Sequence, residues 1–580
     1  RYYPFDFKYP RLAQPWNFPD WPLFVRAFGP YTCYFPTVPF RFYMPHQIMR
    51  WKALKIAWGG SCFGYAISSF LAFNHKSAFR SAFPDMPDFN NLYGVGLGDS
   101  VRQVINRLWI YQFGVWQTTW NQINWNLLPQ QTLAQLKLNF LDESNTAHQS
   151  LRIYNQHGSG AHEVNPYKLV QHPTYPSIWW LYVYDSNHPN SLNQAFVIDT
   201  SDSSWEYDDL FGWDGKKGLF LTDAVTNYLT NPARPNDPFP DVSPVSSSGV
   251  SDTVVQLYNS PDAFITITAA FGRITGYEDS IAFSMLPGAI PIIPVTGRFH
   301  PPIGYHLPDG EYSVRMHEFS DSLTHFYAFT DSLIYGFERS GTQAVQTDYL
   351  RMGNGLSFRN PDPATKTIHL STVIIEDTSS EKVYYIDDMA VSQGDSLRMR
   401  ALNHRDLMVT NVGGGKTYDL RLTLASTAGE SNFAHADVVL DSTSTHFIVP
   451  MWDSLRTRPV RILIDRGNNG TIDDSVFIVN QATDVDQMFV GLPQEYRLEQ
   501  NYPNPFNAAT QIQYTIPMQG HVTLKLYDLL GREVTTMVDQ TQERGTYKVQ
   551  WDASGYASGV YFYRLHARDF ISTKKLTLIR

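Results

Sequence analysis

A proline- and serine-rich stretch near the middle of the chain separates two parts with different hydrophobic patterns. It reads NPARPNDPFPDVSPVSSSGVS over residues 231–251, a composition typical of a linker. Before it, helical spacing comes first and alternating strands follow. Beyond it, alternation dominates, as in AFITITAAF and TYDLRLTLA. With 580 residues, the chain is expected to form three or four domains.

Composition excludes several classes of partner. Charged residues make up only 17% of the chain and no Lys/Arg run is present, so nucleic acid is not expected as a partner. The low charge and a 14% aromatic content together indicate an extracellular protein. Cys33 and Cys62 are the only cysteines, which excludes a disulfide framework. No apolar run has the length of a transmembrane segment, so none is expected.

One loop has the spacing of a metal site but lacks its ligands. Residues 465–473, DRGNNGTID, place Asp465, Asn469 and Asp473 as in a calcium loop. However, Gly467 stands where a second ligand belongs, and no downstream Glu closes the cage. We therefore expect a hairpin turn here, and neither a metal nor a cofactor.

Residues 1–45 form a segment rich in aromatic residues and proline. Its many prolines disfavour long helices and central strands, so an extended arm is expected. Aromatic rings at this density need a surface to cover them. The arm is expected to lie on its own domain or on another copy of the chain, which would allow self-association.

Residues 46–230 are expected to form an α+β domain, because helices come first and antiparallel strands follow. One helix is predicted over residues 101–116 and another from Pro129. The predicted strands are residues 151–155, 161–170, 178–185 and 195–199, and a last helix is predicted near residues 223–229.

The stretch GGSCFGYAISSFLAF places a cysteine at the start of a helix. Its apolar residues have the spacing of one buried helix face: Phe63, Ala66, Ile67, Phe70 and Leu71. Ser61 is a good N-cap, so Cys62 falls in the first turn. Unpaired backbone N–H groups and the helix dipole favour a thiolate there. The alternative is a small buried cysteine without a chemical role.

A histidine and a carboxylate on a later hairpin could complete a catalytic triad with Cys62. His162, in GSGAHEVNPYKL, follows a flexible loop and begins a strand. If the hairpin turns around Pro173-Thr174, His162 lies opposite Asp185. A register slipped by two residues instead brings Asn187 opposite His162. The candidate catalytic residues are therefore Cys62, His162 and Asp185, with Asn187 as the second choice for the orienting group.

The motifs GGSCFG, GAHEVNPY and VYDSNHP occur in the order Cys, His, Asp, and this order resembles papain-like cysteine peptidases, including bacterial members of that superfamily. The resemblance covers roughly residues 46–230. It implies a papain-like fold and a peptidase that acts on a peptide or protein substrate through Cys62. Ile56 stands near the place where such enzymes carry a glutamine for the oxyanion hole, so one oxyanion donor is left unassigned.

Alternating segments after the linker predict two β-sandwiches, at residues 252–390 and 391–485. Residues 498–580 contain the segments NYPNPFN, LYDLLGRE and GVYFYRL. With these segments they resemble a type IX secretion C-terminal sorting domain, which implies an Ig-like β-sandwich. That resemblance implies type IX secretion machinery as a partner, and a secreted or bacterial cell-surface location. The residues that carry it are Asn501, Pro503, Asn504, Pro505, Phe506, Tyr527, Gly531, Trp551, Asp552, Gly559, Val560 and Tyr561.

Three functions are compatible with these patterns. The first is a secreted cysteine hydrolase, most simply a peptidase with a Cys-His-Asp triad. The second is a structural or adhesive surface protein built on a peptidase scaffold without catalysis, in one version a polymeric assembly. The third is a carbohydrate-binding or carbohydrate-hydrolysing protein, for which no pair of catalytic carboxylates is apparent.

Overall fold

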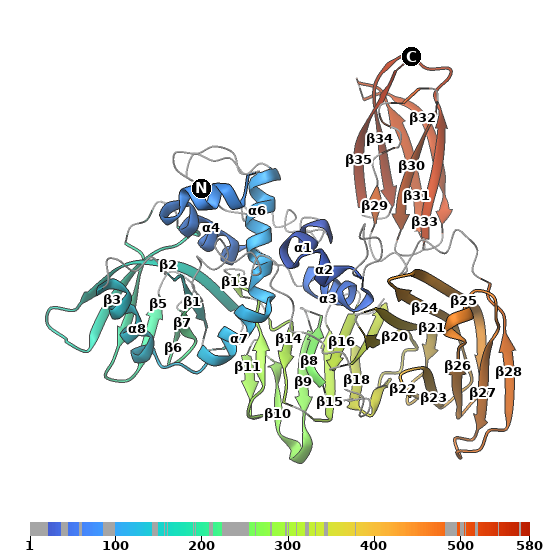
Figure 1. Ribbon diagram of the computed structural model, residues 1–580, viewed down its shortest axis with the longest axis horizontal. Helices are drawn as coiled ribbons and strands as arrows, with labels where there is room; N and C mark the ends of the chain where they lie inside the picture. The colour runs from blue at the N-terminus through green and yellow to red at the C-terminus, as the bar shows by residue number, and fades with distance from the viewer. Residues whose placement is uncertain are drawn as a thin grey trace. The chain divides into compact units, whose positions relative to one another are not determined.

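The computed structural model divides the chain into two compact units, Arg1–Gln481 and Ala482–Arg580 (Figure 1). The structure describes residues 21–35, 44–56, 61–84, 99–141, 149–222, 254–481 and 496–579, except 156, 159, 189–190, 192, 208–212, 261–262, 279–280, 296–297, 300, 309, 319–323, 331, 341–345, 378, 499–500, 502–503, 505, 508, 517–519, 530, 543–544 and 568–569. The predicted linker at 231–251 and the predicted helix at 223–229 lie outside the described residues.

The first unit begins with helices. They are α1 (Trp21–Phe28), α2 (Pro30–Cys33), α3 (Pro45–Ile56), α4 (Cys62–Asn74), α5 (Lys76–Ala82), α6 (Asp99–Ile110), the 3-10 turn η4 (Tyr111–Phe113), α7 (Val115–Asn124) and α8 (Pro129–Leu141). Gly114 is extended, with φ -71° and ψ 159°, and it separates η4 from α7. The helix predicted over residues 101–116 is therefore interrupted.

The prediction of an extended arm over residues 1–45 is wrong where the structure describes it. Residues 21–33 form α1 and α2, and the prolines at positions 22 and 30 lie in their first turns, where a missing N–H costs nothing. Phe24, Ala27 and Phe28 have the i, i+3, i+4 spacing of a helix face, and all three are completely buried. Residues 1–20 lie outside the described residues.

An antiparallel sheet follows the helices. Its strand order is β6 (Trp213–Gly215), β5 (Ser204–Tyr207), β4 (Ala195–Asp199), β3 (Ile178–Tyr184), β2 (Gly160–Gln171), β1 (Leu151–Tyr154) and β7 (Leu219–Leu221). One more strand, β13 (Arg298–Phe299), pairs with β2 although it comes from beyond the linker (Figure 1). This sheet therefore includes β13, a strand from the residues that the sequence pattern places in the β-sandwich at 252–390.

Residues 254–478 form two large sheets. The described part of one has the order β11 (Ile281–Ser284), β10 (Ile274–Glu278), β9 (Ala263–Thr268), β15 (Tyr312–Glu318), β18 (Gln346–Gly353), β19 (Gly355–Arg359), β22 (Ser396–Leu402), β23 (Asp406–Val412), β26 (Ser444–Val449), β27 (Val460–Arg466) and β28 (Asp474–Ile478). The other has the order β12 (Ile290–Ile292), β14 (Gly304–His306), β8 (Val254–Asn259), β16 (Thr324–Thr330), β17 (Leu333–Ser340), β20 (Lys366–Asp377), β21 (Ser380–Val391), β24 (Lys416–Ser426) and β25 (Gly429–Leu440).

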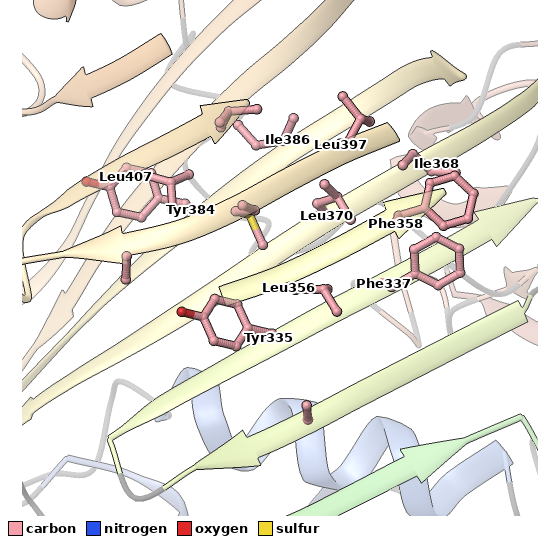
Figure 2. Close-up of a cluster of buried hydrophobic side chains, with 14 of the residues drawn as sticks. Tyr335, Phe337, Leu356, Phe358, Ile368, Leu370, Tyr384, Ile386, Leu397 and Leu407 are labelled. Atoms are coloured by element: carbon pink, nitrogen blue, oxygen red, sulfur yellow. The ribbon is translucent and has the colours of Figure 1, made fainter. Parts of the chain in front are cut away.

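The two sheets share one hydrophobic core, so the predicted division into sandwiches at 252–390 and 391–485 is wrong. The proposed boundary falls inside β21, and each sheet continues across it. Figure 2 shows part of this core, where alternate residues of β17 and β19 meet. The Phe337 and Phe358 rings, one from each sheet, have centroids 4.9 Å apart. Alternation correctly indicates strands, but it carries no signal for where one sheet stops.

The β12–β25 sheet is buried on its outer face as well, because the N-terminal helices cover it. Phe24, Cys33 and Met49 lie in one core with Phe329 and Val383. Every residue of β16 is accordingly buried, which explains why THFYAFT does not alternate. The N-terminal helices and the sandwich are therefore parts of one folded body.

A buried carboxylate joins α3 to this sheet. Glu381 of β21 accepts hydrogen bonds from the backbone N–H of His46 and from its Nδ1. Arg50 of α3 lies over the Phe329 ring, 4.4 Å from the centroid, and donates to Gln256. The two His46 contacts place the Glu381 carboxylate at the N-terminus of α3, where the unpaired backbone N–H groups favour a negative charge.

We expect His46→Ala to destabilise the first unit by about 1.5 kcal/mol, because one charge-assisted hydrogen bond to Glu381 is lost. Thermal unfolding of the full chain measures this loss. His521→Ala is the control, since His521 is an exposed residue of the second unit paired with Asp539. An equal shift for both variants would contradict the role given to Glu381.

The second unit is a β-sandwich. Its sheets are β29 (Arg497–Leu498), β30 (Ala509–Ile516) and β33 (Gly545–Asp552), and β32 (Glu533–Gln542), β31 (Gly520–Tyr527), β34 (Gly559–Ala567) and β35 (Phe570–Leu578). The NPFN motif joins β35 through the backbone: Phe506 N–H donates to Thr577 O, and Asn504 accepts from Thr577 N–H. Phe506 is buried against Trp551, with ring centroids 5.6 Å apart. Asn504 and Phe506 are therefore structural parts of this sandwich.

Residues 467–473 connect β27 and β28 as the predicted hairpin turn. The Asp465 carboxylate accepts from the backbone N–H groups of Asn469 and Gly470 and so closes the turn. Across the described ranges, no group of three His, Cys, Asp or Glu side chains is placed to hold a metal ion. None of the helices described is both long and apolar enough to cross a membrane.

Candidate active site

Cys62 is the first residue of α4, and this helix lies in the middle of the N-terminal core. Ser61 occupies the N-cap position but its side chain does not cap the helix; it donates to Asn106 Oδ1 at 2.7 Å. α4 and α6 approach closely at Gly64, where an added Cβ would lie 2.1 Å from the Ile105 carbonyl oxygen. Glycine at this position therefore allows α6 to fix the start of α4.

The structure brings Cys62, His162 and Asp185 together. Cys62 Sγ lies 2.6 Å from His162 Nδ1, and His162 Nε2 lies 2.8 Å from Asp185 Oδ1. Their exposures are only 3%, 0% and 0%. Asp185 Oδ1 accepts a hydrogen bond from Nε2–H. In this tautomer of the neutral ring, Nδ1 carries no proton and can accept one from the Cys62 thiol. This is the nucleophile–base–orienter order of thiol hydrolases, in a site closed to solvent.

The predicted β2–β3 register is wrong, although the contact derived from it exists. Pro166 pairs with Val183, and Leu169 pairs with Leu181 after a bulge. The hairpin turns through residues 173–177, closed by His172 N–H donating to Ile178 O, so its centre lies later than assumed. Near the site, the strands follow the slipped alternative, and Asp185 reaches His162 from just beyond the end of β3.

Asn187 contributes a backbone group to the site. Its backbone N–H donates to Asp185 Oδ1 at 2.8 Å, and Tyr207 Oη donates to Asp185 Oδ2 at 2.8 Å. These two donors, one on each carboxylate oxygen, restrain the carboxylate that accepts from His162. Asp185 thus contacts the His162 ring, and Asn187 supports the carboxylate through its backbone N–H.

A buried ion pair links the histidine strand to the cysteine helix. Glu163 is completely buried, and Arg152 of β1 donates Nε–H to its Oε2 at 2.8 Å. The Arg152 guanidinium also lies over the Phe63 ring, 4.8 Å from the centroid. Glu163 N–H donates to Cys62 Sγ at 3.2 Å. Glu163 therefore contacts the Cys62 sulfur with its backbone, while Arg152 fixes the Glu163 side chain.

The sequence predictions missed Arg152, Glu163 and Tyr207. A usable signal exists for the first two, because a single Arg in the apolar strand LRIY faces the Glu that follows His162 across the short loop at His157-Gly158. Tyr207 has no such signal, since it comes from β5 and reaches Asp185 through tertiary packing.

Burial and charge act in opposite directions on the triad. Burial raises the pKa of the Cys62 thiol, and the adjacent His162 counteracts only part of that rise. Burial lowers the pKa of His162, but the Asp185 carboxylate and the Cys62 sulfur outweigh it and hold the pKa well above 6.5. Burial raises the pKa of Asp185, but His162 and the backbone and Tyr207 donors outweigh it, so the pKa is lowered. Burial therefore opposes a charge on Cys62, whereas the Asp185 carboxylate acts in the direction that favours proton uptake by the His162 ring.

We expect a pH-dependent contribution of the His162–Asp185 pair to stability. The raised His162 pKa gives stability that is present below about pH 6.5 and is lost as pH rises through the folded-state value. The lowered Asp185 pKa gives stability that is present above about pH 4 and is lost as pH falls through the folded-state value. The melting-temperature difference between wild type and Asp185→Asn should be largest between these limits.

Thermal melts from pH 3 to pH 9 measure this difference. Asp202→Asn is the control, because Asp202 is 53% exposed and its Lys216 partner lies 3.8 Å away. A difference for Asp185→Asn that stays constant over the whole range would contradict the pairing.

Comparisons with known proteins identify the second unit. No curated protein sequence matches this chain. Two solved structures from Porphyromonas gingivalis show distant likenesses, each at 10% identity and a TM-score of 0.13. PorZ, a surface component of the type-IX secretion system, overlaps 72% of this chain and 82% of its own; dimeric latent PorU overlaps 82% and 50%. At these TM-scores, neither likeness assigns a fold or function.

Residues 500–579 match the secretion system C-terminal sorting domain family. The match begins just before the NPFN motif and ends just after β35, so it covers strands β30 to β35 of the second unit. This chain therefore carries a type IX sorting domain and is secreted to the cell surface or the extracellular space.

Proposed function

We propose that this secreted chain is a cysteine hydrolase, a papain-like peptidase in which Cys62 is the nucleophile, His162 the general base and Asp185 the orienting group. The observation that carries the proposal is the continuous chain of contacts, 2.6 Å from Sγ to Nδ1 and 2.8 Å from Nε2 to Oδ1, at the start of a buried helix. The resemblance to papain-like sequences supports the same assignment.

In the proposed reaction, Cys62 Sγ attacks the carbonyl carbon of a peptide bond while His162 Nδ1 receives the thiol proton. The protonated imidazole then gives this proton to the nitrogen of the scissile bond; the C–N bond breaks, the amine departs, and the acyl group remains on Cys62 as a thioester. Water hydrolyses the thioester with His162 again as base. Asp185 holds the ring throughout, and the backbone N–H of Cys62 supplies one oxyanion donor.

A second candidate is a non-catalytic surface scaffold, and burial of the triad favours it. Cys62, His162 and Asp185 are all inaccessible, so a substrate does not reach the sulfur in this conformation. In this alternative, the triad is a buried polar cluster of the core, and the aromatic N-terminal segment mediates self-association. The two candidates differ in one measurable property, thiol-dependent cleavage.

The test is cleavage of a denatured protein such as casein by the full chain under reducing conditions, with new N-termini identified by mass spectrometry. The assay uses the wild-type chain and two variants designed to open the site, Trp109→Phe and Val295→Pro, which are argued for in the next subsection and called the opened variants. Each of these three proteins is also assayed with Cys62→Ala. New N-termini that disappear with Cys62→Ala support the peptidase. Identical products with and without Cys62, in the opened variants as well, would overturn it in favour of the scaffold.

A further inference from the structure

The edge of β2 beside the nucleophile is defined by the β1 register. Asn155 N–H donates to Gly160 O, and Arg152 stands opposite Glu163. Hydrogen-bonded pairs alternate along an antiparallel ladder, so the backbone groups of Ala161 and Glu163 point away from β1. Those of Glu163 face Cys62 Sγ. Ala161 therefore offers the next outward-facing backbone position on the same edge of β2. It lies two residues before Glu163, whose backbone contacts Cys62 Sγ.

A segment from the sandwich occupies that position. Residues 293–295 and β13, together called the crossing segment here, run beside β2: Val295 bridges to Ala161 in parallel, and β13 pairs with Gly160 and Ala161. β3 takes up the same side of β2 only from Asn165 onward. Cys62 thus contacts β2 at Glu163, between the residues of β2 that pair with the crossing segment and those that pair with β3.

Both backbone groups of Val295 are held by side chains of the helical part. Trp109 Nε1–H donates to Val295 O at 3.0 Å, and Val295 N–H donates to Gln112 Oε1 at 2.8 Å. The Val295 side chain is completely buried in the core that contains Cys62. Val295 is therefore fixed at three points, its N–H, its C=O and its side chain, where it lies beside Ala161 of β2.

We propose that the Ala161 edge of β2 is where an extended peptide docks to reach Cys62, and that the crossing segment blocks it as an internal inhibitor. This inference rests on the proposed function and adds its substrate geometry and its regulation. Successive same-edge positions are about 7 Å apart along a strand, so a peptide lying over Cys62 along this edge meets the crossing segment at its next residue. Displacement of that segment would open the site without any change in the triad.

The experiment measures the rate at which iodoacetamide alkylates each cysteine of the folded full chain, by mass spectrometry of the two labelled peptides. Trp109→Phe removes the indole donor to Val295 and keeps an aromatic ring; Val295→Pro removes the N–H bound by Gln112. We expect Trp109→Phe to speed alkylation of Cys62 about tenfold, the effect of one lost buried hydrogen bond on an opening equilibrium, and Val295→Pro to speed it more.

Trp452→Phe is the matched control, because Trp452 is also buried and donates to a backbone carbonyl, Arg405 O at 2.8 Å, elsewhere in the sandwich. Cys33, fully buried, reports unfolding in every variant. Faster labelling of Cys62 alone in Trp109→Phe and Val295→Pro supports the block. Unchanged Cys62 labelling overturns it, and so does a parallel rise at Cys33 or an equal effect of Trp452→Phe.

Adding His162→Gln to the opened variants separates this inference from the proposed function. If both hold, the opened Cys62 reacts readily at pH 6 to 7 and loses that reactivity when His162 is replaced. If the opened Cys62 reacts like an ordinary thiol whether or not His162 is present, the crossing segment still covers the cysteine, but the peptidase assignment fails.

Discussion

Replacing His162 by glutamine is expected to reduce thiol-dependent peptide cleavage by at least a hundredfold. The glutamine side chain can hydrogen-bond to Asp185 but cannot accept the Cys62 proton, and general base catalysis is worth roughly 10²–10⁴-fold. The loss should appear in kcat rather than in KM, because the 2.6 Å contact serves the reacting sulfur and not substrate binding. The measurement is kcat and KM, determined separately on a fluorogenic peptide in the Trp109→Phe background.

His172→Gln is the control for this substitution, since His172 lies on the same hairpin and its Nδ1 accepts only from the turn residues Thr174 and Tyr175 in the described contacts. It should retain the full rate. A His162→Gln enzyme as fast as this control would show that Cys62 is not activated by the imidazole.

Replacing Arg152 by methionine should destabilise the first unit by about 3–5 kcal/mol. The substitution leaves the Glu163 carboxylate buried without its cation, which is the costly way to break a buried ion pair. Methionine keeps the unbranched stem and much of the contact with Phe63. Adding Glu163→Gln should restore part of the lost stability, because a neutral amide is less costly to bury than an unpaired charge. Thermal and denaturant unfolding of the full chain measure both variants.

Arg339→Met tests whether any effect on Cys62 is local. Arg339 is 3% exposed in its side chain and pairs with Asp348 within the sandwich, away from the triad. Both variants should lower stability, but only Arg152→Met should change the pH profile of Cys62 alkylation. If Arg339→Met changes that profile as much, the Arg152–Glu163 pair has no particular connection with the site.

Local patterns in the sequence predicted most of the elements around the triad. The apolar spacing after Cys62 predicts a helix, and α4 begins at that residue. The strands at 161–170 and 178–185 correspond to β2 and β3. These predictions depend on neighbours a few residues apart, whose periodicity is written directly in the chain.

The β2–β3 register could not be predicted from the hydrophobic pattern, because two local irregularities each shift the pairing. A five-residue turn replaces the tight turn assumed at Pro173, and a bulge at Tyr167, next to Pro166, shifts the pairing again. Asp185 still meets His162, because a carboxylate just past the strand end can reach diagonally across the hairpin. Its donors, Tyr207 and Asn187, could not be assigned from a register that was wrong.

Long-range pairing accounts for the errors in domain boundaries. β13 is only two residues long in a stretch without clear alternation, and nothing local links Arg298 to Ala161 across the linker. The continuous core of the sandwich likewise depends on strands such as β19 and β17, which meet through Phe358 and Phe337. Sequence periodicity reports which face of a strand is apolar, and it does not report which sheet covers that face.

The pairing of β13 with β2 has a consequence for how this protein can be divided by gene engineering or by recombination. A fragment ending at residue 230 would lose β13 and Val295, and it would expose the Phe24 and Phe28 rings that the sandwich helps to bury. Such a fragment would present an open strand edge and an apolar surface, the two features that promote aggregation. The smallest transferable part that retains Cys62 in its native surroundings is therefore the first unit as a whole, helices and sandwich together.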